Sequence, residues 1–116
     1  ADKTAGNYIR ACRAGAVQVG SEWHATGLIV SVDALITGWQ PADPANPVAD
    51  DFAQALALDP ELIVFGTGAT HRFPSQALMV AIMERGVGFE VMATDAACRT
   101  YNVLAAEDRR VVAALL

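Results

Sequence analysis

Residues 62–92 have the sequence LIVFGTGATHRFPSQALMVAIMERGVGFEVM, and this stretch decides the fold. It opens with a continuous apolar run that ends at Gly66, which is typical of a strand covered on both faces. A helical pattern follows over 74–85, and a second strand is predicted at 89–92. A strand, a helix and a strand of this combined length predict a βαβ unit with a right-handed parallel crossover.

The helix of this unit is predicted from the spacing of its apolar residues. Leu78 and Ile82 lie four residues apart and Met79 flanks them, so that they share one face of the helix. Pro74 suits the first turn, because its fixed φ angle is helical. Gly86 suits the position just past the last turn.

A second helix and a last strand are predicted after the βαβ unit. Thr94 or Asp95 can cap the helix, and Asp95 precedes Arg99 by four residues, the favourable order for an intrahelical ion pair. Residues 111–116 are all apolar and predict a strand, although their spacing also fits a helical stripe. The apolar face of the helix is formed by Ala97, Tyr101, Leu104 and Ala105.

The first third of the chain predicts an antiparallel meander. Ile9 and Ala11 alternate with Arg10, which is the period of two expected of a half-buried strand. The remaining strands of the meander are predicted at 17–19, 23–26, 28–32 and 34–39. The glycines that suit turns, bends or bulges between these strands are Gly15, Gly20 and Gly27.

The segment between the meander and the βαβ unit is predicted to contain a loop and a short helix. A proline stands at every third residue from Pro41 to Pro47, which excludes a regular helix or a central strand there. A helix is predicted over 49–58, where Asp50 and Asp51 in the first turn favour the positive end of the helix dipole. Its buried face is predicted to contain Phe52, Ala55 and Leu56.

Length, composition and charge limit the possible classes of protein. The chain has 116 residues, 53% of them apolar and 18% charged, which predicts a single globular domain over residues 1–116. A formal net charge of −5 and scattered Lys and Arg residues argue against nucleic-acid binding. No apolar run reaches the roughly 18 to 20 residues of a membrane-spanning helix, and the polar start does not resemble a signal peptide. We therefore expect a soluble, cytoplasmic protein without membrane insertion.

The two cysteines, Cys12 and Cys98, lie far apart in the sequence and form no CxxC or Cys/His motif. Neither a zinc site nor a disulfide framework is therefore predicted, and no bound metal is expected. Reduced thiols of a cytosolic protein are the simplest interpretation, while a single disulfide between the two residues stays open.

The candidate site lies where the two predicted parallel strands end. At this carboxyl edge the outgoing loops lie side by side, and helix N-termini present free N–H groups. We therefore expect residues 66–72 and 94–102 to converge on a crevice for a small anion or for an acidic side chain of a partner. The candidate ligand-binding residues are Gly66, Thr67, Gly68, Thr70, His71, Arg72, Thr94, Cys98, Arg99, Tyr101 and Asn102.

The Gly66-Thr67-Gly68 motif is not specific for a cofactor. A Gly-x-Gly without a third glycine is not the dinucleotide fingerprint, and without a Lys-Ser/Thr pair it is not a P-loop. No cofactor is therefore predicted. The alternative interpretation is that both glycines serve a tight turn and bind nothing.

No catalytic constellation stands out in the sequence. Cys98 near a helix N-terminus could act as a nucleophile with His71 as its base, but a Cys in an Ala-rich helix is more often a small buried residue. Asp50 and Asp51 are explained by helix capping, so that no carboxylate pair is predicted. The sequence therefore favours a binding or assembly module over an enzyme. The aromatic residues predicted to lie in the core, at its rim, or in an interface on the sheet face are Tyr8, Trp23 and Trp39.

Three stretches carry a resemblance to a known family: 64–68, 84–92 and, above all, 94–104 followed by Glu107. The most specific part is Arg99-Thr100-Tyr101-Asn102, because such a polar tetrad inside a short helix is uncommon. On these residues the chain resembles a small bacterial and mitochondrial family of domains of unknown function. The mitochondrial members of that family include an assembly factor for respiratory complex I.

The resemblance implies an α/β fold with three layers around a mixed, partly parallel central sheet, to which the N-terminal antiparallel β-meander is added. It implies a protein partner, and it supplies no catalytic residues. The expected function is therefore a protein-interaction module that helps to assemble a larger, respiratory complex. The alternatives are a small-molecule or anion-binding protein, including a cryptic enzyme, centred on 66–72, and a structural domain without a ligand.

Overall fold

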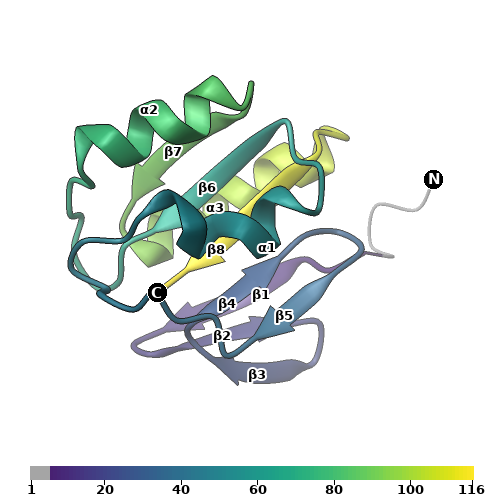
Figure 1. Cartoon of the computed structure of the whole chain (residues 1–116). Coiled ribbons are helices and arrows are strands. Elements are labelled where there is room, and N and C mark those ends of the chain that lie inside the picture. Colours follow the sequence, from purple (N-terminus) through teal and green to yellow (C-terminus); the bar gives the residue numbers. More distant parts are fainter. Residues whose placement is uncertain (1–5) are drawn as a thin grey trace.

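The computed structural model of the chain describes residues 6–116, which form two β-sheets and four helical segments (Figure 1). The smaller sheet is antiparallel, with the order β1-β2-β3, and the larger has the order β5-β4-β8-β6-β7. The strands are β1 (Ile9–Arg13), β2 (Ala16–Val19), β3 (Glu22–Ala25), β4 (Leu28–Val30), β5 (Leu35–Thr37), β6 (Leu62–Gly66), β7 (Gly88–Met92) and β8 (Val111–Leu115). The helical segments are the 3-10 helix η1 (Ala49–Phe52) and the α-helices α1 (Ala53–Leu56), α2 (Gln76–Glu84) and α3 (Thr94–Ala106).

The five-stranded sheet is mixed, as the resemblance implies. Strand β6 pairs in parallel with β7 on one side and with β8 on the other, so the predicted parallel pairing of the βαβ unit is confirmed. Strand β4 is antiparallel to β8 and to β5. The strand alternative for residues 111–116 is therefore confirmed over β8, which occupies the centre of the sheet.

The five-stranded sheet is covered on both faces, which explains the unbroken apolar run of β6. Leu62 and Val64 belong to a buried cluster with α3 and the three-stranded sheet. Ile63 and Phe65 belong to a second cluster with η1, α1 and α2. Figure 1 shows the resulting layers, with the helices α1 and α2 on one side of the larger sheet and the purple N-terminal strands below it.

The predicted meander is divided between the two sheets. Strands β1, β2 and β3 form the three-stranded antiparallel sheet, whereas β4 and β5 form a hairpin at the edge of the larger one. The change of sheet occurs at Gly27, which has a φ of 54° and whose carbonyl accepts a hydrogen bond from Trp39 N at 2.9 Å. The bend predicted at this glycine is therefore confirmed, because only glycine adopts such a conformation without strain.

Strand β1 differs from the predicted alternation. Ile9 pairs with Val19, but the register then shifts, so that Ala11 pairs with Gln18 and Cys12 with Val17. Val17 and Val19 are both buried, and the extra residue in β1 therefore places Cys12, rather than Ala11, on the inner face with Ile9. The expectation that Ile9 and Ala11 share a face was wrong, because the β-bulge adds one residue to β1 and so reverses which of the following side chains point inward.

The helix boundaries follow the hydrogen bonds of their first turns. Helix α2 begins two residues after Pro74, because the Ser75 hydroxyl caps it by accepting a bond from Leu78 N at 3.1 Å. Gly86, with a φ of 76°, follows its end as predicted. Helix α3 begins at Thr94 itself, and neither Thr94 nor Asp95 is its N-cap residue.

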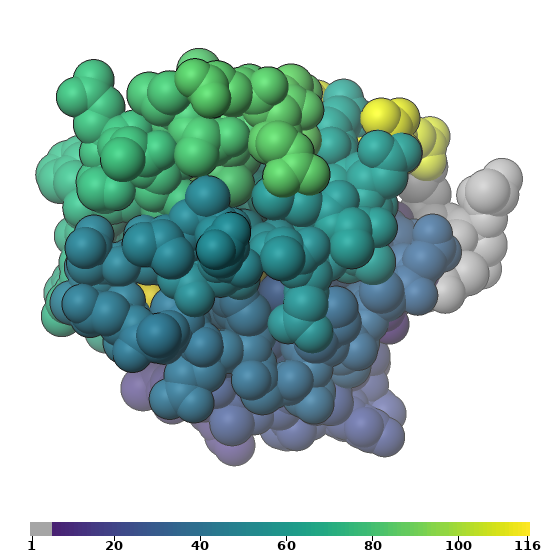
Figure 2. All heavy atoms as spheres, in the orientation of Figure 1, coloured from purple at the N-terminus to yellow at the C-terminus, as the bar shows by residue number. Residues whose placement is uncertain are grey.

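The helix predicted over 49–58 is shorter and begins with a 3-10 turn. Asp51 accepts a hydrogen bond from Val48 N at 2.8 Å, which confirms its capping role. Trp39, Phe52 and Phe65 pack together with ring centroids 5.1–6.1 Å apart, and Trp39 Nε1 donates to Asp51 O at 2.7 Å. Figure 2 shows the atoms of this segment filling the space between α2 and the N-terminal strands.

Candidate functional site

The loops that follow β6 and β7 meet at the carboxyl edge of the five-stranded sheet. Gly68 N donates to Thr94 Oγ1 at 2.9 Å, and Thr94 N donates to Gly68 O at 2.8 Å. Gly66 permits this approach, because a Cβ atom there would lie 2.8 Å from Thr94 Oγ1 and 3.0 Å from Thr94 Cα. The two loops therefore converge as the parallel strands predicted.

Thr94 fills the junction between these loops, which explains why it does not cap α3. Its hydroxyl accepts from Gly68 N and donates to Leu116 O at 3.0 Å, so that it joins the loop after β6 to the end of β8. Thr67 closes the same loop from inside: its hydroxyl donates to Thr70 O at 2.7 Å and accepts from Arg72 N at 3.1 Å. Several of the backbone amides that were expected to bind an anion therefore have acceptors within the protein.

The outer part of the loop presents its side chains to solvent. Thr70, His71 and Arg72 are all exposed. Phe73 follows them with 87% of its surface exposed, and its ring centroid lies 4.5 Å from that of His71. We did not predict Phe73 as a site residue, although a large apolar residue directly before the Pro74-Ser75 helix start was a visible signal.

Cavities adjoin both sides of the junction. One of about 270 Å³ lies between the β1–β2 turn and the Gly68–Thr94 contact. Its lining residues are Cys12, Arg13, Ala14, Gly15, Thr26, Gly68, Ala69, Thr94, Asp95 and Leu116. A second, also of about 270 Å³, is lined by Pro44, Ala45, Thr67, Gly68, Ala69, Thr70, Arg72 and Leu116.

The candidate residues farther along α3 divide into one exposed and three inward residues. Arg99 is exposed, and its Nη1 lies 3.9 Å from Asp95 Oδ2, which confirms the predicted ion pair. Tyr101 is fully buried and donates to Asn7 O at 2.6 Å. Asn102 donates to Ile9 O at 2.6 Å and accepts from Ile9 N at 2.9 Å. Asn102 therefore holds β1 against α3 and Tyr101 holds the segment before β1, both at a distance from the Gly68–Thr94 junction.

The environment of Cys98 raises the pKa of its thiol to about 12. Burial is the main cause, since only 3% of the residue is exposed, and the neighbouring Cys12 thiol adds to it. A catalytic thiol needs a lowered pKa, so this environment gives the nucleophile hypothesis no support. Burial likewise raises the pKa of Tyr101 above its usual value.

The three aromatic residues predicted as core or interface residues have different environments. Trp39 is a core residue of the cluster around Phe52. Trp23 is 40% exposed on the three-stranded sheet, with the Arg13 guanidinium 4.1 Å from its ring centroid. Tyr8 is partly buried and lines a further cavity at the opposite edge of the larger sheet.

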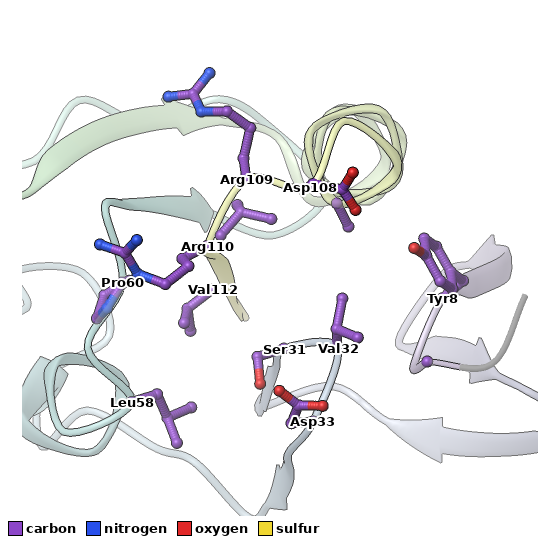
Figure 3. Close-up of a pocket in the computed structure, with 13 residues that line it drawn as sticks. Tyr8, Ser31, Val32, Asp33, Leu58, Pro60, Asp108, Arg109, Arg110 and Val112 are labelled. Atoms are coloured by element: carbon purple, nitrogen blue, oxygen red, sulfur yellow. The ribbon is translucent and has the colours of Figure 1, made fainter. Parts of the chain in front are cut away.

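This further cavity, of about 400 Å³, lies where β6 and β8 begin (Figure 3). Its charged lining residues include Asp33, Arg109 and Arg110. Arg109 Nε lies 3.2 Å from Glu61 Oε2, and Figure 3 shows its side chain pointing away from the cavity. Arg110 Nε donates to Asp59 O at 3.2 Å. Sequence reasoning missed this cavity, because its lining comes from segments that are far apart in the chain.

Among residues 6–116, no three His, Cys, Asp or Glu side chains gather into a group that would hold a metal ion. Within the same part of the chain, no helix combines the length and the apolar content needed to cross a bilayer.

Comparison with known proteins gives a family and several relatives. Residues 9–116 match the model of a family described as "Protein of unknown function (DUF498/DUF598)". The chain is 37% identical over 84 residues to NADH dehydrogenase (ubiquinone) 1 alpha subcomplex assembly factor 3 of Homo sapiens. This match covers 70% of this chain and 45% of the human protein. It is also 41% identical over 56 residues to the 13 kDa major membrane protein of Francisella tularensis, and this match covers 48% of this chain and 46% of that protein. The chain thus spans less than half the length of both relatives.

The fold also matches a solved structure closely. A crystal structure of a Bordetella parapertussis protein superposes with a TM-score of 0.88 at 34% sequence identity, and the match covers 97% of this chain and 96% of that one. The two-sheet arrangement is therefore shared over nearly the whole of both chains.

Proposed function

Because this chain belongs to the DUF498/DUF598 family, we propose that it is a protein-interaction module that assists the assembly of a respiratory NADH dehydrogenase. The similarity to the human assembly factor supplies the kind of complex. The proposed place of action is the cytoplasm, where the module would bind a subunit before it joins the complex.

The observation that carries the proposal is the exposure of Phe73 beside Arg72. A Phe that is 87% exposed costs free energy in water, and burial against a partner would recover it. Aromatic and Arg side chains are enriched at the centres of interfaces. The proposed docking surface, which we call the Phe73 edge, consists of Thr70, His71, Arg72 and Phe73.

The hydrogen bonds of the same loop favour a protein over an anion as its ligand. Gly68 N and Arg72 N donate to the hydroxyls of Thr94 and Thr67, so they are not available to oxygen atoms of a phosphate. The groups that the loop presents outward are side chains, and they combine an aromatic ring with a positive charge. This chemistry suits an apolar pocket with a carboxylate at its rim.

Deletion and complementation in the host organism test the proposal. We expect deletion to lower NADH-linked oxygen consumption and the amount of assembled complex on native gels, while succinate-linked respiration stays unchanged. Unchanged NADH-linked respiration after deletion would contradict the assembly role.

The Phe73 edge is tested by variants in the same complementation assay. Phe73→Ala combined with Arg72→Ala should weaken partner binding by about 30-fold or more, since a hot-spot residue contributes about 2 kcal/mol or more. The matched control is Met83→Ala, which removes another exposed apolar side chain, 61% exposed, from α2. Full complementation by the double variant would show that the partner binds elsewhere.

A second candidate, a small-molecule binder, is favoured by the cavity of about 270 Å³ beside Cys12 and Thr94. Saturating ligand should then stabilise the protein by about 1 to 3 kcal/mol. A thermal-shift screen of metabolites measures this stabilisation, and Ala69→Trp, which would fill the entrance, should abolish it.

A further inference from the structure

The two cysteines of the chain, which stand 86 positions apart, lie in the same cluster of the folded protein. Cys12 lies on β1 and faces α3, which carries Cys98. Both are free thiols in the structure. Cys98 belongs to the buried cluster between α3 and the three-stranded sheet, and Cys12 packs against this cluster.

Two features of the chain bring these thiols together. The first is the β-bulge in β1, which places Cys12 instead of Ala11 on the face toward α3. The second is Asn102, one helical turn after Cys98, which fixes β1 by two hydrogen bonds to the backbone of Ile9. Strand and helix are therefore held in register, with Ile9 opposite Asn102 and Cys12 opposite Cys98.

The two thiols differ in their access to solvent. Cys98 is buried, whereas Cys12 is partly exposed and lines the cavity of about 270 Å³ at the carboxyl edge of the sheet. One basic and one acidic residue, Arg13 and Asp95, line the same cavity, and the Arg13 guanidinium lies over the Trp23 ring. A disulfide reagent that approaches from this side therefore meets Cys12 before the buried Cys98.

We propose that Cys12 and Cys98 form an oxidisable pair that closes into an intramolecular disulfide, with a small-molecule disulfide of the glutathione class as oxidant. This inference goes beyond the proposed assembly function and does not depend on it.

The reaction proceeds by two exchanges. The thiolate of Cys12 attacks one sulfur of the oxidant, the sulfur–sulfur bond breaks, and one glutathione leaves as a thiolate that takes up a proton. Cys98 then loses its proton and attacks the Cys12 sulfur of the mixed disulfide, and the second glutathione leaves. The protein gives up two electrons and two protons, and one glutathione disulfide becomes two glutathione thiols. Because the pKa of Cys98 is raised, the second exchange is the slower one.

The disulfide would fasten the three-stranded sheet to α3 by a covalent bond. The sheet is otherwise held there by packing and by the hydrogen bonds of Tyr101 and Asn102. A bond that closes so long a loop restricts the unfolded chain, so the oxidised protein should unfold at a higher temperature than the reduced one.

The test is incubation of the folded, reduced protein with glutathione disulfide, followed by alkylation, denaturation and mass spectrometry. We expect a transient single glutathione adduct, then a product lighter than the reduced protein by two hydrogen atoms. Trypsin should release peptides 11–13 and 86–99 as one disulfide-linked species. A glutathione adduct that persists as the end product, or linked dimers of the chain, would overturn the proposal.

Two matched variants separate the roles of the cysteines. Cys98→Ser should stop at the single adduct on Cys12, and Cys12→Ser should react at a rate at least tenfold below that of the native protein. An equally fast reaction of Cys98 in Cys12→Ser would overturn the order of attack, and circular dichroism of both variants confirms that they are folded.

Discussion

At the scale of single residues, Asn102 shows how one side chain joins two layers. Its amide group donates to Ile9 O at 2.6 Å and accepts from Ile9 N at 2.9 Å, so that it mimics the pairing of a neighbouring strand. Tyr101 adds a bond to Asn7 O from the preceding position on the helix. Tyr101 and Asn102 thus link the edge of the three-stranded sheet to α3 by hydrogen bonds.

Asn102→Ala is therefore expected to lower the free energy of unfolding by about 2 kcal/mol, because it leaves a donor and an acceptor of Ile9 without partners. Urea unfolding followed by circular dichroism measures this change. The matched control is Val103→Ala on the exposed side of the same helix, which should change stability by about 0.5 kcal/mol or less. Equal losses in the two variants would contradict the proposed role of Asn102.

The sequence identified the tetrad from Arg99 to Asn102 as unusual but did not reveal its use. The partners of Tyr101 and Asn102 lie more than 90 positions away, at Asn7 and Ile9, and local spacing carries no information about them. The same is true of Cys12, whose side chain faces Cys98 only because of a bulge that the alternation of β1 does not predict.

At the scale of elements, the glycine between β3 and β4 determines how the chain leaves one sheet for the other. Gly27 combines a φ of 54° with close contact to the backbone of Trp39, and a Cβ atom would overlap the Trp39 carbonyl oxygen. Gly15, in the β1–β2 turn, has a φ of 76°, but a Cβ atom there would point into open space.

Gly15→Ala is therefore expected to cost about 1 to 2 kcal/mol, from its backbone conformation alone. Gly27→Ala should cost about 3 kcal/mol or more, because overlap adds to the same backbone term. Thermal unfolding of the two variants measures the difference. A Gly27→Ala variant as stable as Gly15→Ala would contradict this prediction, since it would show that the β4–β5 hairpin shifts relative to Trp39 and relieves the overlap.

Glu61 joins the starts of β6 and β8. Its carboxylate accepts from Arg110 N at 2.8 Å and lies 3.2 Å from Arg109 Nε. The backbone bond from Arg110 and then the charge of Arg109 lower the pKa of Glu61 below its usual 4.5. A carboxyl group whose pKa is lower in the folded protein than in the unfolded chain stabilises the fold at pH values above its unfolded-state pKa. This contribution is lost as the pH falls through the folded-state pKa.

Glu61→Gln should therefore be less stable than the native protein at pH 7, and the difference should shrink as the pH falls below about 4.5. Urea unfolding at a series of pH values measures it, with Glu90→Gln on β7 as the exposed control. A difference that stays constant down to pH 3 would contradict the role of the Glu61 charge.

The elements themselves were largely predictable, because they depend on local patterns. The apolar run of β6, the spacing of Leu78 and Ile82 and the position of Gly86 each identified a real element. The start of α3 was harder, because Thr94 uses its hydroxyl for Gly68 and Leu116 instead of for its own helix.

At the scale of the whole molecule, the two buried clusters share the strands of the larger sheet. Val64 and Val30 belong to the cluster beneath α3, and Ile63 and Ile29 to the cluster beneath α2. Neighbouring residues of one strand thus support opposite faces. Loss of either layer would expose the strands that support the other.

We therefore expect the two layers to unfold together. The variant Trp23→Phe/Cys12→Ser retains one tryptophan, Trp39, in one cluster and one thiol, Cys98, in the other. Trp39 fluorescence and alkylation of Cys98 should give the same urea midpoint, as two-state unfolding requires. Earlier exposure of Cys98 would show that the three-stranded sheet and α3 separate before the rest.

The overall arrangement was predicted in part. The convergence of the loops at Gly68 and Thr94 followed from the parallel strands, whose direction the βαβ pattern gives. The division of the meander at Gly27 did not, although the apolar run of β4 differs from the mixed sequence of β3, because the strands that pair with β4 lie elsewhere in the chain. Phe73 was not predicted as a site residue, because the exposure of one apolar side chain depends on the packing of the rest of the chain.

The central position of β8 has a consequence during protein synthesis. Strand β8 lies between β4 and β6, yet the ribosome produces it after both. Until residues 111–115 leave the exit tunnel, β4 and β6 have no common neighbour, and each keeps an unpaired backbone edge. The nascent chain therefore passes through a state with unpaired strand edges, which is the kind of state that is prone to self-association.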